Sequence, residues 1–275
     1  MDLSDKGALV TGAASGIGRA TAELLAERGC RVSVVDRDED GGKAVADAVG
    51  GLFVACDVAS SAAVNAAFAR CAQELGRLDI AHLNAGVATD VTDITQLSDD
   101  EYRRMMGVNV DGVVFGARAA ARIMREQNGG AIVATASLAG IMAFAPDPLY
   151  TLTKHAVVGL VRSAAEGLAT HGITINAVCP GFTDTNILTP ATKASLREFG
   201  FALIEPRRVA EAVLLAIESG ETGQCWICQP GLEPLPYQFR GVPGPRVDRD
   251  PAAPTPDANA ARRAFGTATG HSSPR

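Results

Sequence analysis

The sequence predicts a doubly wound α/β fold, in which helices cover both faces of a parallel sheet. Short apolar runs alternate with longer amphipathic runs through roughly the first 230 residues, as in chains that build a parallel sheet with crossover helices. Apolar residues form 47% of the 275 residues, which is enough for a large core. No repeat or linker interrupts this region, so we expect one domain over residues 1–232.

The apolar runs predict the strands and the amphipathic runs predict the helices. We expect strands at residues 8–11, 31–35, 52–56, 80–84, 131–135, 173–179 and 225–228. We expect helices at residues 17–28, 41–49, 60–75, 99–127, 150–171 and 207–219. Because strand–helix–strand units are right-handed, this order places helices on both faces of the sheet.

The composition changes after Gly231. Seven prolines fall between residues 234 and 256, with little hydrophobic periodicity. Proline cannot continue a helix, so residues 233–275 are predicted to form a Pro-rich, non-helical and partly disordered C-terminal extension. Tyr237 and Phe239 remain in it, so we expect residues 234–246 to pack on the domain or on a neighbouring subunit.

Charge and hydropathy exclude several classes of protein. The net charge is −6 without a basic stripe, which argues against nucleic acid as a partner. The sequence has no apolar run long enough to span a membrane and no signal peptide, so we expect a cytoplasmic protein.

Two of the six cysteines, Cys225 and Cys228, have the spacing of a redox or metal motif. They lie in a predicted strand, where residues three apart point to opposite faces, so their sulfur atoms should diverge. The sequence offers no second cysteine pair and no nearby histidine to complete a zinc site. We therefore expect structural cysteines and no metal.

The first predicted strand leads into a glycine-rich loop at residues 11–18. Glycines permit a tight turn and let the backbone approach a phosphate, which the free N–H groups at the helix start can bind. A tight turn that binds nothing is the alternative, but the position after a first strand favours a dinucleotide site. The residues expected to contact the dinucleotide are Gly12, Ser15, Gly16, Ile17 and Gly18.

Asp36 ends the second predicted strand, where a carboxylate can accept both ribose hydroxyls of an adenosine and would repel a 2′-phosphate. Arg37 could hold that phosphate, but the uncharged glycine loop gives it no help. We therefore predict NAD rather than NADP. Asp57 and Val58 follow the third strand, at the level of an adenine, although Asp57 could instead cap the next helix in competition with Ser60.

Small and polar residues also follow the later strands, whose carboxyl ends line the ligand crevice in sheets of this kind. Asn109 differs, because it lies inside a long amphipathic helix, where a buried amide must find partners and is often structural. The residues that follow the strands are Asn84, Ala85, Gly86, Ser137, Pro180 and Gly181.

Tyr150 and Lys154 stand four residues apart, so both emerge on one face of a helix. An ammonium beside a phenol lowers the pKa of the phenol, which can then exchange a proton with a carbonyl or alcohol oxygen. Taken alone, the same spacing occurs by chance on many solvated helices. The motifs upstream favour the catalytic interpretation.

Together these motifs resemble the short-chain dehydrogenase/reductase family in its compact soluble form. The resemblance implies a Rossmann-like sheet of seven parallel strands. It extends over about residues 5–232, and the motifs occur in the family's order and spacing. The matching pieces are residues 11–18, Asp57, Asn84–Gly86, Asn109, Ser137, Tyr150 with Lys154, and Pro180-Gly181.

The resemblance also implies a role for each catalytic residue. Tyr150 would be the general acid/base, and Ser137 would hydrogen-bond the same substrate oxygen. Lys154 would hold the nicotinamide ribose and, with the cationic nicotinamide, depress the pKa of Tyr150. Asn109 would kink its helix and hold a water that links Lys154 to solvent.

The segment after Pro180-Gly181 carries further implied roles. Thr183 through its backbone and Thr185 through its hydroxyl would meet the nicotinamide carboxamide, and the residues up to the helix at 207 usually form a mobile lid. The family also implies a homo-oligomer, a dimer or a tetramer. Gln229 and Pro230 depart from the family's usual ending at a subunit contact, which weakens the expectation of a tetramer more than that of a dimer.

The predicted substrate is a secondary alcohol or ketone with an apolar body, such as a steroid-like, prostaglandin-like or alicyclic compound. The expected lining is apolar and carries no arginine or lysine, although these residues could instead be packed core. Because NAD is abundant in its oxidised form in cells, we expect the enzyme to oxidise the alcohol rather than reduce the ketone. The residues expected to line the substrate site with Ser137 and Tyr150 are Leu138, Met142, Phe144, Leu149, Phe182, Ile187 and Leu188.

Two other functions stay open at this point. One is an NADPH-dependent ketoreductase of lipid or polyketide synthesis, which predicts NADP use and carrier-linked substrates. The other is a non-enzymatic dinucleotide-binding scaffold, which the intact set of Asn109, Ser137, Tyr150 and Lys154 disfavours.

Overall fold

The structure is a computed structural model that describes residues 2–89 and 91–241. The chain up to Tyr237 forms one compact unit, and a second unit begins at Gln238. The predicted domain boundary at residue 232 therefore falls inside the first unit. The predictions made for residues 242–275, including partial disorder, lie outside the described residues.

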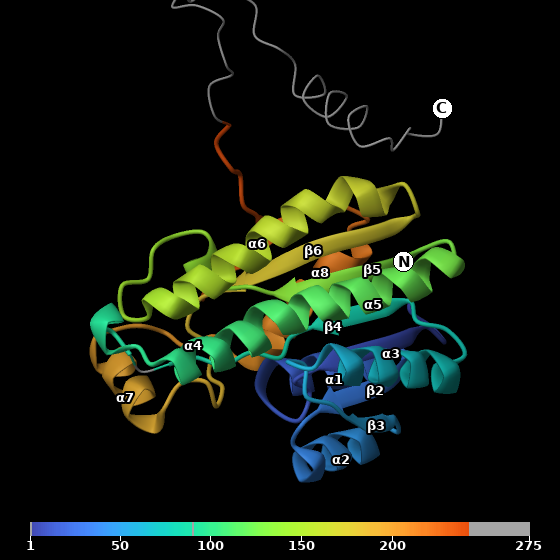
Figure 1. Cartoon of the computed structure of the whole chain (residues 1–275), viewed down its shortest axis with the longest axis horizontal. Helices are drawn as coiled ribbons and strands as arrows, with labels where there is room; N and C mark the ends of the chain where they lie inside the picture. Colours follow the sequence, from blue (N-terminus) through green and yellow to red (C-terminus); the bar gives the residue numbers. More distant parts are fainter. Residues whose placement is uncertain (1, 90, 242–275) are drawn as a thin grey trace, which may run out of the picture. The chain divides into compact units, whose positions relative to one another are not determined.

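The predicted parallel sheet is confirmed (Figure 1). Within the described residues it has the order β3-β2-β1-β4-β5-β6-β7, all parallel, followed by a short antiparallel β8 at the far edge. Most predicted strand ends are correct to within one residue. The strands are β1 Gly7–Thr11, β2 Arg31–Asp36, β3 Leu52–Ala55, β4 Ile80–Leu83, β5 Gly130–Thr135, β6 Ile173–Pro180, β7 Cys225–Cys228 and β8 Leu235–Pro236.

Helices cover both faces of the sheet, as predicted. On one face α1 (Gly16–Glu27) packs against α8 (Pro206–Glu218), and on the other α3 (Ser61–Leu75) packs beside α5 (Gly112–Glu126) (Figure 1). The longest helix, α6 (Pro148–Ala169), lies next to β6. The remaining α-helices are α2 (Glu39–Ala48), α4 (Asp99–Met106) and α7 (Pro190–Glu198).

Two helical regions differ from the prediction. The single helix expected at residues 99–127 is interrupted by a π-helical segment, η2 (Gly107–Asp111), which joins α4 to α5. Helix α7 was not predicted, because none of its residues is buried and its sequence carries no clear apolar face. Its start is nonetheless marked, since Thr189 caps it and Pro190 occupies its first turn.

The start of the Pro-rich extension packs on the domain. Strand β8 pairs with Trp226 and Ile227 of β7, and the Tyr237 N–H donates to the Cys225 carbonyl at 2.8 Å. This confirms the expected packing for residues 235–237 and adds an eighth strand to the seven that were predicted. Prolines are tolerated here because an edge strand leaves some of its N–H groups unpaired.

The six cysteines all fall within the described ranges, where each is buried and free of disulfides. Cys225 and Cys228 form the ends of β7, and burial raises the pKa of the Cys228 thiol to about 12. A thiol held protonated in this way is a poor nucleophile, which supports a structural role for Cys228, whereas a hydrogen bond with Cys179 lowers the pKa of the Cys225 thiol. Within residues 2–89 and 91–241, no helix has both the length and the apolarity needed to cross a membrane.

Candidate active site

A cavity of about 1150 Å³ opens at the carboxyl ends of the parallel strands. It brings together nearly all of the predicted site residues, from the glycine loop at one end to the substrate segment after β6 at the other. Three predicted residues do not line it: Gly18 lies beneath the glycine loop, Asn109 is fully buried, and Leu149 is buried in the first turn of α6. Leu149 was predicted to contact the substrate, but the structure buries it away from the cavity.

The predicted cofactor-binding, catalytic and substrate-binding residues all contribute to the lining of the cavity. The predicted residues that line it are Gly12, Ser15, Gly16, Ile17, Asp36, Arg37, Asp57, Val58, Asn84, Ala85, Gly86, Ser137, Leu138, Met142, Phe144, Tyr150, Lys154, Pro180, Gly181, Phe182, Thr183, Thr185, Ile187 and Leu188.

The glycine loop requires bare backbone at two points. Gly12 has a φ of +64°, and a Cβ there would stand 2.7 Å from the Ala85 Cα. A Cβ on Gly18 would collide with the Gly12 carbonyl and stand 2.6 Å from Asn84 Nδ2. Ser15 begins α1 without a side-chain cap, so the first N–H groups of the helix face the cavity as an anion site. The loop therefore fits a dinucleotide pyrophosphate.

The carboxylate of Asp36 ties the end of β2 to the glycine loop. One oxygen accepts from the Ala14 N–H at 2.9 Å and the other from the Asp38 N–H at 3.0 Å. Each oxygen keeps a lone pair for a ribose hydroxyl. The competition between Asp57 and Ser60 is also resolved, because Ser60 accepts from the Ala63 N–H and caps α3.

Asn109 lies in the π-helical segment and finds partners for its whole amide. Its Oδ1 accepts from the Val87 N–H at 2.8 Å, and its Nδ2 donates to the Val87 carbonyl at 2.8 Å and to Thr153 Oγ1 at 3.1 Å. The side chain thereby links the loop after β4 to the helix that carries Tyr150. Single-turn π segments of this kind recur at functional sites. At the position of the predicted kink, the structure shows a change of helix type.

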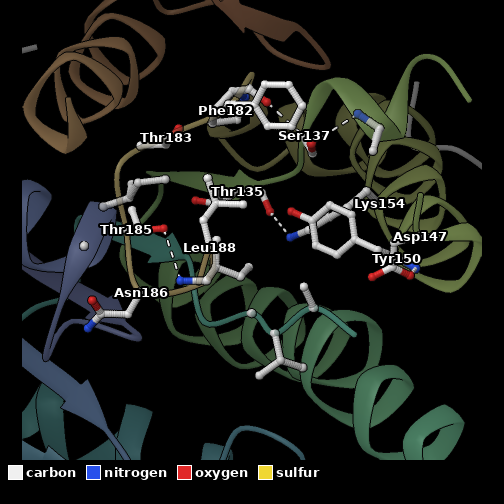
Figure 2. Close-up of a pocket in the computed structure, with 18 of the residues that line it drawn as sticks. Thr135, Ser137, Asp147, Tyr150, Lys154, Phe182, Thr183, Thr185, Asn186 and Leu188 are labelled. Carbon is white, nitrogen blue, oxygen red and sulfur yellow. Dashed lines mark hydrogen bonds between the residues drawn. The ribbon is translucent and has the colours of Figure 1, made fainter. Parts of the chain in front are cut away.

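Tyr150, Lys154 and Ser137 converge on one side of the cavity (Figure 2). Lys154 is 2% exposed, donates from Nζ to the Thr135 carbonyl at 2.8 Å, and lies 5.4 Å from the centre of the Tyr150 ring. Asn109 Oδ1 and Lys154 Nζ both flank Gly86, each 3.5 Å from where its Cβ would stand.

Burial dominates the acid–base properties of this pair. It is the largest cause of a rise in the pKa of Tyr150 to about 12; the negative charge of Asp147 adds to this rise, and the hydrogen bond with the Ser137 hydroxyl opposes it. Burial likewise lowers the pKa of Lys154 to about 8. Desolvation penalises both charged forms and outweighs other effects among the chain's own groups. The expectation that Lys154, together with a cationic nicotinamide, lowers the pKa of Tyr150 stays a prediction.

Asp147 was missed at the sequence level. It is 4% exposed, and its carboxylate accepts from the Tyr150 N–H at 2.8 Å and from the Thr89 N–H at 2.9 Å. It therefore caps α6 and holds the loop after β4 against the catalytic helix. The sequence does contain a signal, because an aspartate followed by Pro148 is a typical helix start.

The substrate end of the cavity has an aromatic wall. The Phe182 ring makes edge-to-face contacts with Phe144 at 6.0 Å and with Phe201 at 5.6 Å between ring centres. Phe201 follows α7 in the segment that was expected to form a lid, and it was not among the residues predicted to line the substrate site. Arg104 of α4 also lines the cavity and donates to the Ala88 carbonyl at 3.3 Å, so the cavity holds a cation that the predicted lining lacked.

Comparison with known proteins agrees with this geometry. The family model described as short chain dehydrogenase matches residues 6–195. The chain is 40% identical to a 3beta-hydroxysteroid dehydrogenase of Mediterraneibacter gnavus, over 71% of this chain and 72% of that protein. It is 38% identical to the human 15-hydroxyprostaglandin dehydrogenase [NAD(+)], over 70% of this chain and 74% of that protein.

A solved structure is similar as well. The 3-ketoacyl-(acyl-carrier-protein) reductase from Brucella melitensis, complexed with NADH, superposes with a TM-score of 0.78 at 30% identity, over 83% of this chain and 98% of that one. Sequence, fold and cavity thus agree along most of the compact unit. The chain belongs to the short-chain dehydrogenase/reductase family, as an oxidoreductase that acts on CH–OH groups with a nicotinamide dinucleotide.

Proposed function

We propose that this protein is an NAD-dependent dehydrogenase that oxidises a secondary alcohol with an apolar body to the ketone. One observation carries the proposal: Tyr150, Lys154 and Ser137 face the same cavity as the glycine loop and Asp36. A cofactor bound along the strand ends would therefore meet a substrate oxygen beside a phenol.

Each catalytic side chain has a distinct task in this proposal. Tyr150 takes the proton from the substrate hydroxyl, and Ser137 positions that oxygen through a hydrogen bond. Lys154 is oriented by the Thr135 carbonyl and supplies positive charge near the Tyr150 ring. Asn109 holds the loop after β4 against α6. The glycine loop and Asp36 would hold NAD, which would supply the hydride acceptor for the substrate carbon.

The preference for NAD rests on the carboxylate of Asp36 at the end of β2. A 2′-phosphate placed there would meet a negative charge, and Asp36 is already fixed by two backbone N–H groups. The names of two similar proteins support this preference, since one is NAD(+)-dependent and the other was solved with NADH.

The preference for an apolar substrate rests on the aromatic wall of Phe144, Phe182 and Phe201, together with Leu138 and Leu188. Binding a ring or a hydrocarbon chain against such a surface removes apolar area from water, which stabilises the complex. The relatives named for a hydroxysteroid and a hydroxyprostaglandin act on molecules of this kind.

A panel of secondary alcohols tests the proposal, with reduced cofactor followed by its absorbance. We expect turnover with NAD, a much lower kcat/KM with NADP, and a preference for steroid and alicyclic alcohols over 2-propanol. Equal or better use of NADP would refute the role of Asp36. Faster ketone reduction than alcohol oxidation at neutral pH would refute the proposed direction.

The Tyr150→Phe variant tests the chemistry separately from binding. We expect NADH binding to persist, because the ring remains, while kcat falls by about 10²-fold or more because the proton acceptor is lost. Tyr237→Phe is the matched control, since this tyrosine does not line the cavity. Unchanged turnover in Tyr150→Phe would contradict the mechanism.

A ketoreductase is the second candidate. Two observations favour it: the similarity to the reductase from Brucella melitensis, and the exposed Arg37 at the rim of the cavity, whose guanidinium could hold a 2′-phosphate. It predicts reduction of carrier-linked 3-keto substrates with NADPH. Because that reductase was solved with NADH, cofactor preference alone does not separate the two candidates, and the decisive assay compares a carrier-linked 3-keto substrate with the secondary alcohols.

A further inference from the structure

A buried chain of hydrogen bonds runs beneath the cavity and involves a histidine to which the proposed chemistry gives no role. His82 lies in β4, between Val10 of β1 and Val133 of β5, and is fully buried. Its Nε2 lies 2.8 Å from Thr135 Oγ1, which in turn donates to Asn84 Oδ1 at 3.0 Å. The chain ends at the glycine loop.

The direction of every proton in this chain is determined. Asn84 Nδ2 donates to the carbonyls of Thr11 and Gly12, both at 3.2 Å, so its Oδ1 must face Thr135. The Thr135 hydroxyl has one hydrogen and gives it to Asn84, so it must accept from His82. His82 is therefore protonated at Nε2, and its Nδ1 has no partner among the described residues.

An imidazole in this position is costly, which indicates that it has a use. The neighbouring strand residues are valines, and an apolar side chain would fill the space without leaving a ring nitrogen unpaired. Burial lowers the pKa of His82 to about 3, so the ring stays neutral at working pH and acts only as a hydrogen-bond donor. Its single donated bond goes to Thr135.

Thr135 is hydrogen-bonded both to Asn84, on the side of the glycine loop, and to Lys154, on the catalytic side. Its hydroxyl orients Asn84, which holds the glycine loop, and its carbonyl accepts from Lys154 Nζ at 2.8 Å. We propose that His82 is a positioning residue that locks Thr135, and through it both the cofactor loop and Lys154. The proposal rests on the proposed function in so far as Lys154 and the loop serve a bound dinucleotide.

Variants of His82 that keep or remove the donor test this role. His82→Leu removes the N–H, whereas His82→Gln can place an amide N–H at nearly the same reach as Nε2. We expect His82→Leu to weaken NADH binding and lower kcat/KM, each by about three- to tenfold, the range for one neutral hydrogen bond. His82→Gln should restore most of both. Equal behaviour of the two variants would overturn the proposal.

A control separates positioning from general destabilisation. Ile80→Val shortens a fully buried side chain in the same strand and touches no polar group of the chain of hydrogen bonds. It should lower the melting temperature without changing NADH binding. If His82→Leu also changed only the melting temperature, His82 would be structural and the proposal would fail.

A double-mutant cycle with Thr135→Val tests the route of the effect. Valine replaces the hydroxyl by a methyl of similar size, so the connection to Asn84 is already lost. In that background His82→Leu should have no further effect on NADH binding. Additive losses would show that His82 acts by another route.

Nitrogen-15 NMR of the imidazole tests the geometry without any substrate or cofactor. The imidazole signal of His82 is identified as the one that disappears in the His82→Gln variant. This signal should report a neutral ring protonated at Nε2, and its chemical shift should not change between pH 8 and pH 5. A ring protonated at Nδ1, or one that titrates near pH 6.5, would overturn the proposal. Failure to oxidise any alcohol would instead count against the proposed function and leave this result intact.

Discussion

At the scale of single residues, burial decides the protonation of the site. Lys154 Nζ lies 5.4 Å from the centre of the Tyr150 ring, yet the pKa of each group is shifted toward its neutral form. With a pKa of about 12 in the chain without cofactor, the phenol holds its proton through the neutral range, and a bound cationic nicotinamide has to lower that pKa for Tyr150 to act as the base. Alcohol oxidation needs the phenol to give that proton up, whereas ketone reduction uses the protonated form directly.

This difference predicts opposite responses of the two reaction directions to pH. We expect kcat/KM for alcohol oxidation to rise between pH 7 and 10, by up to about tenfold per pH unit for a single proton. Ketone reduction should stay flat or fall over the same range. Steady-state rates in both directions provide the measurement, and an oxidation profile that is flat from pH 7 to 10 would contradict the assignment of Tyr150 as the base.

His82 predicts a loss of stability in acid. Its folded pKa of about 3 lies below the ordinary 6.5, so between these values the unfolded chain binds a proton that the folded chain refuses. Stability is therefore lost as pH falls. At about 1.4 kcal/mol per pH unit, the wild type should lose about 2 kcal/mol more than His82→Gln between pH 6.5 and 5. Urea unfolding at the two pH values measures this, and equal losses would contradict it.

At the scale of elements, the first strand, the glycine loop and α1 pack closely as one unit. The loop is shaped by close approaches of backbone to backbone, and Asn84 joins it to the end of β4. A side chain added inside this unit has no free space. A Gly→Ala substitution on an open helix surface meets no neighbour and changes only the helix propensity. A pair of such variants, one crowded and one open, therefore separates the effect of steric crowding from that of helix propensity.

Gly18→Ala and Gly167→Ala form such a pair. The first places a methyl group on the Gly12 carbonyl and should destabilise the fold by about 1–3 kcal/mol while weakening cofactor binding. The second lies in α6 with open space around it and should stabilise by about 0.5–1 kcal/mol. Thermal unfolding and NADH titration measure both. A stable, tightly binding Gly18→Ala variant would contradict the close approach.

At the scale of the whole molecule, the sheet is closed at one edge by the chain's own C-terminal segment. Without β8, the outer edge of β7 would present unpaired N–H and C=O groups to solvent. Tyr237 adds a hydrogen bond at the start of β7. The first residues after the predicted domain boundary therefore belong structurally to the sheet.

Two truncations isolate this contribution. A chain that ends at residue 232 lacks β8, whereas a chain that ends at residue 241 keeps it. We expect the shorter chain to be less stable by about 1–2 kcal/mol, because each hydrogen bond contributes about 0.5–1.5 kcal/mol. It should also self-associate through the exposed edge, as seen by light scattering. Identical behaviour of the two chains would show that β8 has no protective role.

The sequence by itself determined the parallel strands and the side chains at their carboxyl ends. These depend on local patterns, because apolar runs are buried wherever the chain folds, and glycines and helix starts mark the turns between them. The positions of Tyr150, Lys154 and Ser137 follow from this order, since parallel strands end at one edge.

Only the tertiary structure decided what depends on contacts between distant residues. The direction of the Tyr150 pKa shift follows from how deeply the fold buries the phenol, which no local spacing reveals. Helix α7 carries no buried face of its own, and β8 exists only because β7 offers an edge. The bonds from Thr135 to Asn84 and His82 span more than fifty residues of sequence. Desolvation and hydrogen bonding across the sheet are properties of the packed molecule, and local patterns do not contain them.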